Sequence, residues 1–222
     1  MKNEAIEDYL KAIYEIQRSK EKVATTTLAK HMNYAPASVT GMIKKLSEMN
    51  LVTHEPYQGV KLTASGKKIA LEVIRHHRLI ELFLSEALGV PWDKVHKEAE
   101  KWEHVLSEDL EDRIDAYLGH PTHDPHGAPI PDRNGQMPER STTVLSDLKT
   151  KTSAMIVEVN DSDPELLRYL GEKKLFPKTE FKVLAVEPFD GPIKIEIEGK
   201  ECVIGKKVAL QIYVKKTEAQ DK

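Results

Sequence analysis

The chain has 222 residues, 40% of them hydrophobic and 31% charged, a composition typical of a soluble globular protein with one large or two small domains. No apolar run approaches the ~18 residues of a membrane helix, residues 1–10 carry no secretion signal, and a single cysteine excludes a disulfide framework, so we predict a cytoplasmic protein without a membrane partner. The net charge of −3 is uneven: residues 1–73 hold eleven Lys/Arg and eight Asp/Glu, which suits a polyanionic partner, whereas residues 81–116 hold four and eleven, which requires cations nearby.

The first predicted helix spans residues 4–17. Ile6, Leu10 and Ile13 form its apolar face. Asp8 lies on the polar face, where simple solvent exposure is the plainer explanation for a carboxylate.

A winged helix-turn-helix is predicted for the next segment. Residues 25–35 and 36–50 read as two helices separated by a short turn, with Pro36 in the first turn of the second helix. Two short strands around a turn at residues 57–59 follow them. Helices in this order, followed by a two-stranded wing, are a form in which many proteins read the major groove of DNA.

The outward residues of the second of these two helices are small or basic, so DNA can approach it closely. Hydroxyl groups at Ser38 and Thr40 suit base edges or phosphates, and the methyl group of Ala37 suits a thymine methyl. Lysines of the helix and wing would neutralise phosphates, although exposed lysines are also common on helical domains that bind no DNA. The residues predicted to contact DNA are Pro36, Ala37, Ser38, Thr40, Lys44, Lys45 and Lys61.

Histidines and carboxylates concentrate in the middle of the chain, where seven of the nine histidines lie between His76 and His126. His77 and Glu81, four residues apart, share one face of a predicted helix. Imidazoles and carboxylates at steps of three and four on two helices can close on one ion, and unpaired charge at a buried rim would be costly. A second helix would bury Val95, Ala99, Trp102 and Leu106 and carry His96, Glu100, Glu103 and His104 at the rim of that face.

This second helix is predicted to continue to residue 118, with Leu110, Ile114 and Tyr117 or Leu118 on its inner side. Apolar residues that neither the core nor a metal uses would be candidates for a dimer interface. Residues 119–143 hold five of the twelve prolines and read as a loop. His123, Asp124 and His126 form a second group of donors in this loop, for which a solvated loop is the alternative explanation.

The remainder of the chain changes character. Short strands and one helix typical of a small β-barrel are predicted, with the strands at residues 155–159, 181–186, 193–197 and 208–214. Cys202 lies in a strand-like run and is expected to be buried, and the last residues are expected to be disordered.

Three segments resemble the diphtheria-toxin-repressor family of metal-dependent transcriptional regulators in its three-domain form. They are HHRLIE at residues 76–81, VHKEAEKWEH at 95–104 and HPTHDPHGAPIP at 120–131. The resemblance covers nearly the whole chain and implies a mainly α fold with a C-terminal all-β part. The implied domains are a winged helix-turn-helix at 1–73, a helical metal-binding and dimerisation domain with a proline-rich loop at 74–140, and an SH3-like, FeoA-type barrel with its tail at 141–222.

The resemblance also implies two metal sites in each protomer. The primary site would consist of Asp8, Glu100, Glu103 and His104. The secondary site would consist of His77, Glu81, His96, Asp124, His126 and Asp163, with Asn160 and Asp161 as alternatives to Asp163.

The implied metal is manganese. Iron-sensing members of the family place Met and Cys where this chain has Asp8 and Glu100, whereas manganese-sensing members have two carboxylates. Ligation by oxygen and imidazole also suits Mn²⁺, with Fe²⁺, Zn²⁺, Co²⁺ or Cd²⁺ as substitutes. Lys11 stands where two-domain manganese regulators have a bridging Glu, which argues against a closely spaced pair of ions.

The implied function is a metal-activated, homodimeric repressor of metal-uptake genes that binds a palindromic DNA operator. Such a protein is not an enzyme and has no small organic substrate. One competing hypothesis is a metal-dependent hydrolase, because Glu100, Glu103 and His104 are spaced like the H-x-x-E-H motif, although the first His is missing and no general base would remain. The other is a winged-helix regulator that senses a non-metal ligand.

Overall fold

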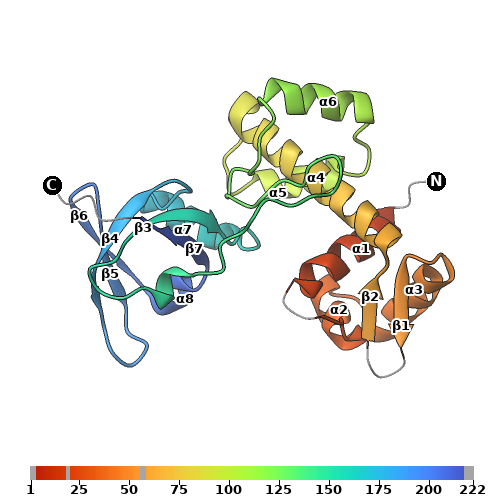
Figure 1. Cartoon of the computed structure of the whole chain (residues 1–222), viewed down its shortest axis with the longest axis horizontal. Helices are drawn as coiled ribbons and strands as arrows, with labels where there is room; N and C mark the ends of the chain where they lie inside the picture. The colour runs from red at the N-terminus through yellow and green to blue at the C-terminus, as the bar shows by residue number, and fades with distance from the viewer. Residues whose placement is uncertain (1–3, 19–20, 56–58, 218–222) are drawn as a thin grey trace. The chain divides into compact units, whose positions relative to one another are not determined.

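The computed structural model describes residues 4–18, 21–55 and 59–217 of the chain (Figure 1). The chain divides into two compact units. The first unit contains the described residues up to His77, together with 100–112 and 131–137. The second contains 78–99, 113–130 and the residues from 138 onward. None of the described helices is long and apolar enough to cross a membrane.

The predicted winged helix-turn-helix is confirmed in the first unit (Figure 1). Asn33, in the left-handed conformation with φ of 55°, ends one helix, and Pro36 begins the next after a short turn. The turn predicted at residues 57–59 lies largely outside the described residues. The elements are α1 (Glu4–Gln17), α2 (Thr25–Met32), α3 (Pro36–Glu48) and the antiparallel pair β1 (Val52–Glu55) and β2 (Gly59–Leu62).

One hydrophobic core holds this part together. The apolar face of α1 is buried as predicted, since Leu10 and Ile13 are fully enclosed and Ile6 nearly so. They pack in the same cluster as Leu28 of α2 and Ile43 of α3. This packing leaves the opposite side of α3 exposed, where all the residues predicted to contact DNA except Lys61 of β2 lie.

The helical region differs from the prediction at the long second helix. A single helix, α4 (Ala64–Leu88), carries His77 and Glu81 and runs across residue 73. The predicted second helix is broken: α5 (Val95–Trp102) ends, and α6 (Glu108–Tyr117) starts anew. The break follows from Ser107, whose hydroxyl accepts from the amide of Leu110, and from the acidic first turn of α6, which favours a helix start.

The break also changes which apolar residues are buried. Trp102 and Leu110, predicted to lie inside, are 43% and 48% exposed, because the chain changes direction after Trp102. Of the two alternatives at the end of the helix, Tyr117 is 69% exposed and Leu118 is half-buried. Leu106 and Ile114 are buried as predicted.

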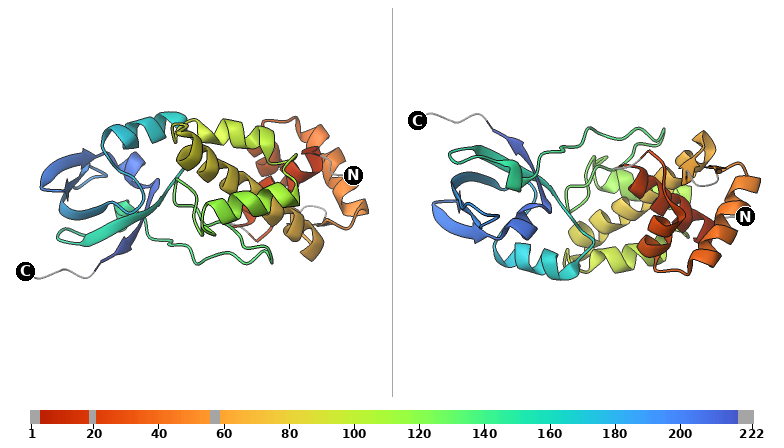
Figure 2. Two further views of the ribbon diagram at one scale, coloured as in Figure 1. Left: turned by 90° about the horizontal axis from the view of Figure 1, so that it is seen from above. Right: turned by 90° about the horizontal axis from the view of Figure 1, so that it is seen from below.

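The C-terminal part of the second unit is an antiparallel five-stranded sheet in the order β6-β5-β4-β3-β7, which confirms the predicted all-β part. α7 (Pro164–Glu172) lies beside the sheet (Figure 2). Its Leu167 and Leu170 enter the same core as the strands. The strands are β3 (Ser153–Val159), β4 (Glu180–Val186), β5 (Ile193–Ile197), β6 (Lys200–Ile204) and β7 (Ile212–Lys216).

Two details of the predicted sheet were wrong. Residues 208–211 are not strand, because α8 (Lys206–Ala209) follows Gly205 and the last strand begins only at Ile212. Cys202 lies on β6 and is only partly buried.

Candidate metal centres

Asp8, Glu103 and His104 come together in the first unit, and we call this group the first centre. One ligand atom from each lies within 4.8 Å of the others. The Nε2 atom of His104 lies 2.9 Å from Asp8 Oδ1 and 3.5 Å from Glu103 Oε1. Residues 95 positions apart in the sequence therefore present a compact set of oxygen and imidazole donors.

The break after α5 positions two of these residues. The amides of Val105 and Leu106 both donate to the carbonyl of Trp102 at 3.1 Å, which closes a turn that holds Glu103 and His104. Nδ1 of His76 lies 3.0 Å from the backbone carbonyl oxygen of Glu103, so α4 supports the same turn. The third residue, Asp8, lies on α1.

Burial and neighbouring charge act differently on the two carboxylates of the first centre. Burial would raise the pKa of Glu103, but contacts from His77 and Lys11 outweigh it and hold that pKa below its usual value. Burial raises the pKa of Asp8 despite the opposing influence of His104. Two other α1 side chains also reach the centre: Glu7 Oε2 lies 2.7 Å from His104 Nδ1, and Lys11 Nζ lies 2.8 Å from Glu103 Oε2.

Glu100, predicted as a fourth donor, lies outside this group. It is exposed on α5 and is not among the three residues whose ligand atoms converge. His77, predicted for the other site, also contacts Glu103 Oε2 directly.

A second centre lies in the second unit and consists of Glu81, Asp124, His126 and Asp161. One ligand atom from each again lies within 4.8 Å of the others. Glu81 Oε2 is 3.8 Å from His126 Nδ1. Among the described residues, neither Asp124 Oδ2 nor His126 Nδ1 has a hydrogen-bond partner, although both atoms are buried. Buried polar atoms are rarely left in this state, and a bound cation would account for both.

The proline-rich loop builds this centre, and it is buried rather than solvated at Asp124 and His126. Asp124 Oδ1 accepts from the amides of His126 and Ala128 at 2.9 Å each, so only Oδ2 remains for a ligand. Gly127 has a φ of 88°, and a Cβ atom at this position would lie only 2.0 Å from the carbonyl oxygen of Val157, so a larger residue would clash there. The loop therefore packs tightly against β3.

His126 is oriented by Trp92. Its Nε2 donates to the carbonyl oxygen of Trp92 at 2.8 Å, which leaves Nδ1 to face the other donors. The indole ring of Trp92 stacks on the imidazole with 5.6 Å between ring centroids. The ring is therefore fixed before any ion binds.

Charge near Asp124 also favours a cation. Burial, and then the negative charge of Glu81, raise the pKa of Asp124 to about 7 in spite of Arg78 and His126. Arg78 approaches Asp124 Oδ2 only to 3.7 Å. A divalent ion would relieve the repulsion between the two carboxylates.

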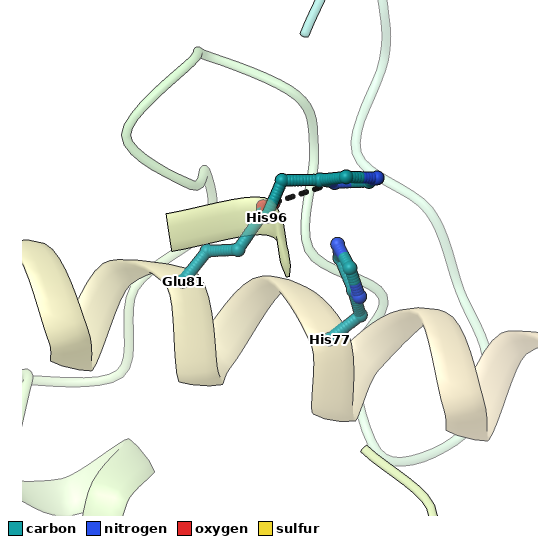
Figure 3. A group of neighbouring side chains, drawn as sticks. All are labelled: His77, Glu81 and His96. Carbon is teal, nitrogen blue, oxygen red and sulfur yellow. Dashed lines mark hydrogen bonds and ion pairs between the residues drawn. The ribbon is translucent and has the colours of Figure 1, made fainter. Parts of the chain in front are cut away.

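His77, Glu81 and His96 form a third group of neighbouring side chains (Figure 3). His77 and Glu81 project from successive turns of α4, and His96 Nδ1 lies 3.1 Å from Glu81 Oε1. Glu81 thus presents one oxygen to His96 and the other to His126. Its two oxygens connect this group with the second centre.

The structure separates the three alternatives left open at residues 160–163. Asp163 caps α7 by accepting from the amide of Glu165. Asn160 Oδ1 accepts from the amide and hydroxyl of Ser162. Asp161 is the residue that joins the second centre. The sequence alone does not distinguish these three polar side chains. The distinction depends on where α7 starts, because the residue at that position is used as its cap.

Donor chemistry at both centres fits a divalent metal ion. The grouped atoms are carboxylate oxygens and imidazole nitrogens, which suit Mn²⁺, Fe²⁺ and Zn²⁺. Sequence reasoning did not identify Glu7 or the Trp92 carbonyl, because a residue that orients a ligand leaves no spacing pattern of its own.

Comparison with known proteins places the chain in a family. Residues 1–60 match the family model for the N-terminal DNA-binding domain of the iron-dependent repressor. Residues 63–132 match the model for the metal-binding and dimerisation domain of the same repressor, and 143–216 match the FeoA domain.

Individual relatives agree with these matches. The iron-dependent repressor of Mycobacterium tuberculosis is 34% identical over 125 residues, 56% of this chain and 54% of that protein, so the match spans about half of that relative. The diphtheria toxin repressor of Corynebacterium jeikeium is 28% identical over 81% of this chain and 77% of its own. A solved manganese-dependent transcriptional repressor in complex with manganese is 38% identical, with a TM-score of 0.88, over 96% of this chain and 100% of that one. The chain therefore belongs to the diphtheria-toxin-repressor family of metal-dependent transcriptional repressors.

Proposed function

We propose that this chain is a manganese-activated repressor that binds a palindromic DNA operator as a homodimer in the cytoplasm and controls metal-uptake genes. The observation that carries the proposal is the first centre, in which Asp8 of the winged-helix part meets Glu103 and His104. The family consists of repressors and not of enzymes, so the hydrolase hypothesis is dropped.

The proposed mechanism couples metal to DNA through α1. A cation held by Asp8, Glu103 and His104 would tie α1 to the turn after α5. A dimer must hold two α3 helices about one turn of DNA apart, ~34 Å. If the ion favours the arrangement that DNA also requires, each ligand must strengthen the binding of the other.

We propose the same DNA-contacting residues that the sequence indicates. On α3, the exposed face carries Pro36, Ala37, Ser38, Thr40, Lys44 and Lys45, and Lys61 is exposed on β2. The hydroxyl of Thr40 donates to the carbonyl of Pro36 at 2.9 Å, so Thr40 would present its methyl group to a base. We assign Ser38 as the hydroxyl donor on this face.

Manganese is proposed because the first centre offers carboxylates and imidazole without sulfur. The solved relative in complex with manganese supports the same choice. We also propose the domain boundaries at residues 73 and 140 and a dimer through the helical domain, where Trp102, Val105 and Leu110 are exposed apolar residues.

The function is tested by measuring DNA binding with and without metal. A duplex is selected from a randomised library with the Mn²⁺-loaded protein and then titrated by fluorescence anisotropy at fixed salt. We expect the chelator-treated protein to bind this duplex at least about tenfold more weakly than the Mn²⁺-loaded form. Equal affinity in both states would contradict the proposal, and a lower threshold for Fe²⁺ than for Mn²⁺ would contradict the choice of metal.

Ion counting tests the second centre. The wild-type chain is expected to bind two Mn²⁺ ions, and His126→Ala or Glu81→Gln is expected to bind one. Each variant removes a donor from the buried group around Asp124. Isothermal titration calorimetry of the chelator-treated protein gives the number of ions. A matched variant, His120→Ala, changes an exposed histidine of the same loop and should keep both ions. Two ions in His126→Ala would contradict the assignment.

A further inference from the structure

Two side chains of α1 flank Asp8 and contact the first centre without belonging to its grouped donors. We propose that Glu7 and Lys11 set the affinity of this centre for its cation in opposite directions. Glu7 raises the affinity by holding His104, and Lys11 lowers it by competing for Glu103. The inference rests on the proposed function, because it takes Asp8, Glu103 and His104 to hold a divalent ion.

Glu7 acts on the imidazole. Glu7 is only 6% exposed, and its Oε2 lies 2.7 Å from Nδ1 of His104. A carboxylate can only accept, so Nδ1 carries the proton and donates it to this bond. The opposite nitrogen, Nε2, is then the one available to an ion, and it already faces Asp8 at 2.9 Å. Removing a partner of this kind typically weakens a metal site about 10- to 100-fold.

Lys11 acts on the carboxylate. Its ammonium nitrogen lies 3.0 Å and 2.8 Å from the two oxygens of Glu103 and 3.2 Å from Nδ1 of His77. Glu103 is 2% exposed, so Lys11 supplies the positive charge that a buried carboxylate needs in the ion-free protein. A divalent ion that binds Glu103 must displace this ammonium or lie beside it, and two cations at one carboxylate repel.

The opposite effects of Glu7 and Lys11 on metal affinity distinguish this proposal from a purely structural role of α1. If α1 contacts the turn after α5 only to hold the fold together, loss of either side chain should loosen the centre, and both variants should bind metal more weakly. If Lys11 is a tethered competitor, its loss should tighten binding, although the same variant removes a buried contact.

The experiment measures Mn²⁺ affinity in the full chain carrying His126→Ala, so that the first centre is observed alone. Binding is followed by electron paramagnetic resonance of free Mn²⁺. Glu7→Ala is expected to weaken binding about 10- to 100-fold, and Glu7→Gln, whose amide oxygen still accepts from Nδ1, to stay near the parent. Lys11→Met is expected to tighten binding about tenfold, and Lys11→Arg, which keeps the charge, to stay near the parent.

The control is Lys22→Met, which makes the same substitution at a lysine that pairs with Glu55 on the surface, and it should leave the affinity unchanged. Weaker or unchanged binding in Lys11→Met, or unchanged binding in Glu7→Ala, overturns the inference alone. A parent that binds no Mn²⁺, or whose binding survives Asp8→Ala, contradicts the proposed function itself and removes the inference with it. Thermal unfolding with and without Mn²⁺ gives a second readout, since Lys11→Met should show the larger rise in Tm on adding Mn²⁺.

Discussion

Asp8→Ala and Glu103→Ala are each expected to abolish the stimulation of DNA binding by Mn²⁺ while the protein stays folded. Each substitution removes one of three convergent donors of the first centre. Asp8 is the only one of the three on α1, so its loss disconnects any ion at Glu103 and His104 from the DNA-binding part. A metal coupling of about 1–3 kcal/mol, or 5- to 150-fold in affinity, should disappear.

Fluorescence anisotropy with a fixed duplex, repeated across free Mn²⁺ concentrations, measures this loss. Circular dichroism checks the fold. A matched variant, Glu4→Ala, removes an exposed carboxylate of α1 one turn before Asp8 and should respond to Mn²⁺ as the wild type does. A normal Mn²⁺ response in Asp8→Ala would show that the first centre does not connect metal to DNA.

Arg75→Met is expected to destabilise the protein by about 3–5 kcal/mol, because it leaves a buried carboxylate without its cation. Arg75 Nε donates to Glu111 Oε1 at 2.5 Å and its Nη1 donates to the carbonyl of Pro131 at 2.9 Å, with both charged side chains buried. Urea denaturation followed by circular dichroism measures the loss. Replacing both partners, as Arg75→Met with Glu111→Gln, should recover part of it. The exposed pair of Lys22 and Glu55 provides the control, for which Lys22→Met should cost below about 1 kcal/mol.

The same pair predicts a dependence on pH. Although burial would raise the pKa of Glu111, bonds from His76 and Arg75 lower it from 4.5 to about 2. A depressed folded pKa means that the stabilisation is complete above the unfolded value of 4.5 and is lost as pH falls toward 2. The stability of wild type should therefore exceed that of Glu111→Gln most at neutral pH, and the difference should shrink between pH 4.5 and 2. A constant difference over this window would contradict the role of the ionised carboxylate.

The sequence predicted the fold best where periodicity and breakers agree. The apolar face of α1 and the turn before Pro36 were both readable, since one depends on spacing and the other on a residue that fixes the backbone. The break between α5 and α6 was missed, because the apolar spacing continues through it while a local cap at Ser107 starts a new helix. Apolar spacing does not reveal such a cap, so the helix start at Ser107 is apparent only in the folded structure.

The candidate centres show the same limit. Donors on one helix, such as His77 and Glu81, follow from spacing alone. Asp161 could not be separated from its neighbours, because the distinction depends on which carboxylate caps α7. One contact was not foreseen: His77 lies against Glu103 of the first centre as well as in the group with Glu81 and His96. Distances between segments far apart in the sequence decide this, and no local pattern reports them.

The donor set of both centres bears on how the protein meets oxidants. Each grouped donor is a carboxylate or an imidazole, and the chain's one thiol, at Cys202, lies on β6 and is not among them. Peroxide destroys a thiolate ligand by converting it to sulfenic or higher acids, whereas carboxylates and imidazoles are far less reactive toward it. Neither centre therefore has a thiolate ligand that peroxide could remove by direct oxidation.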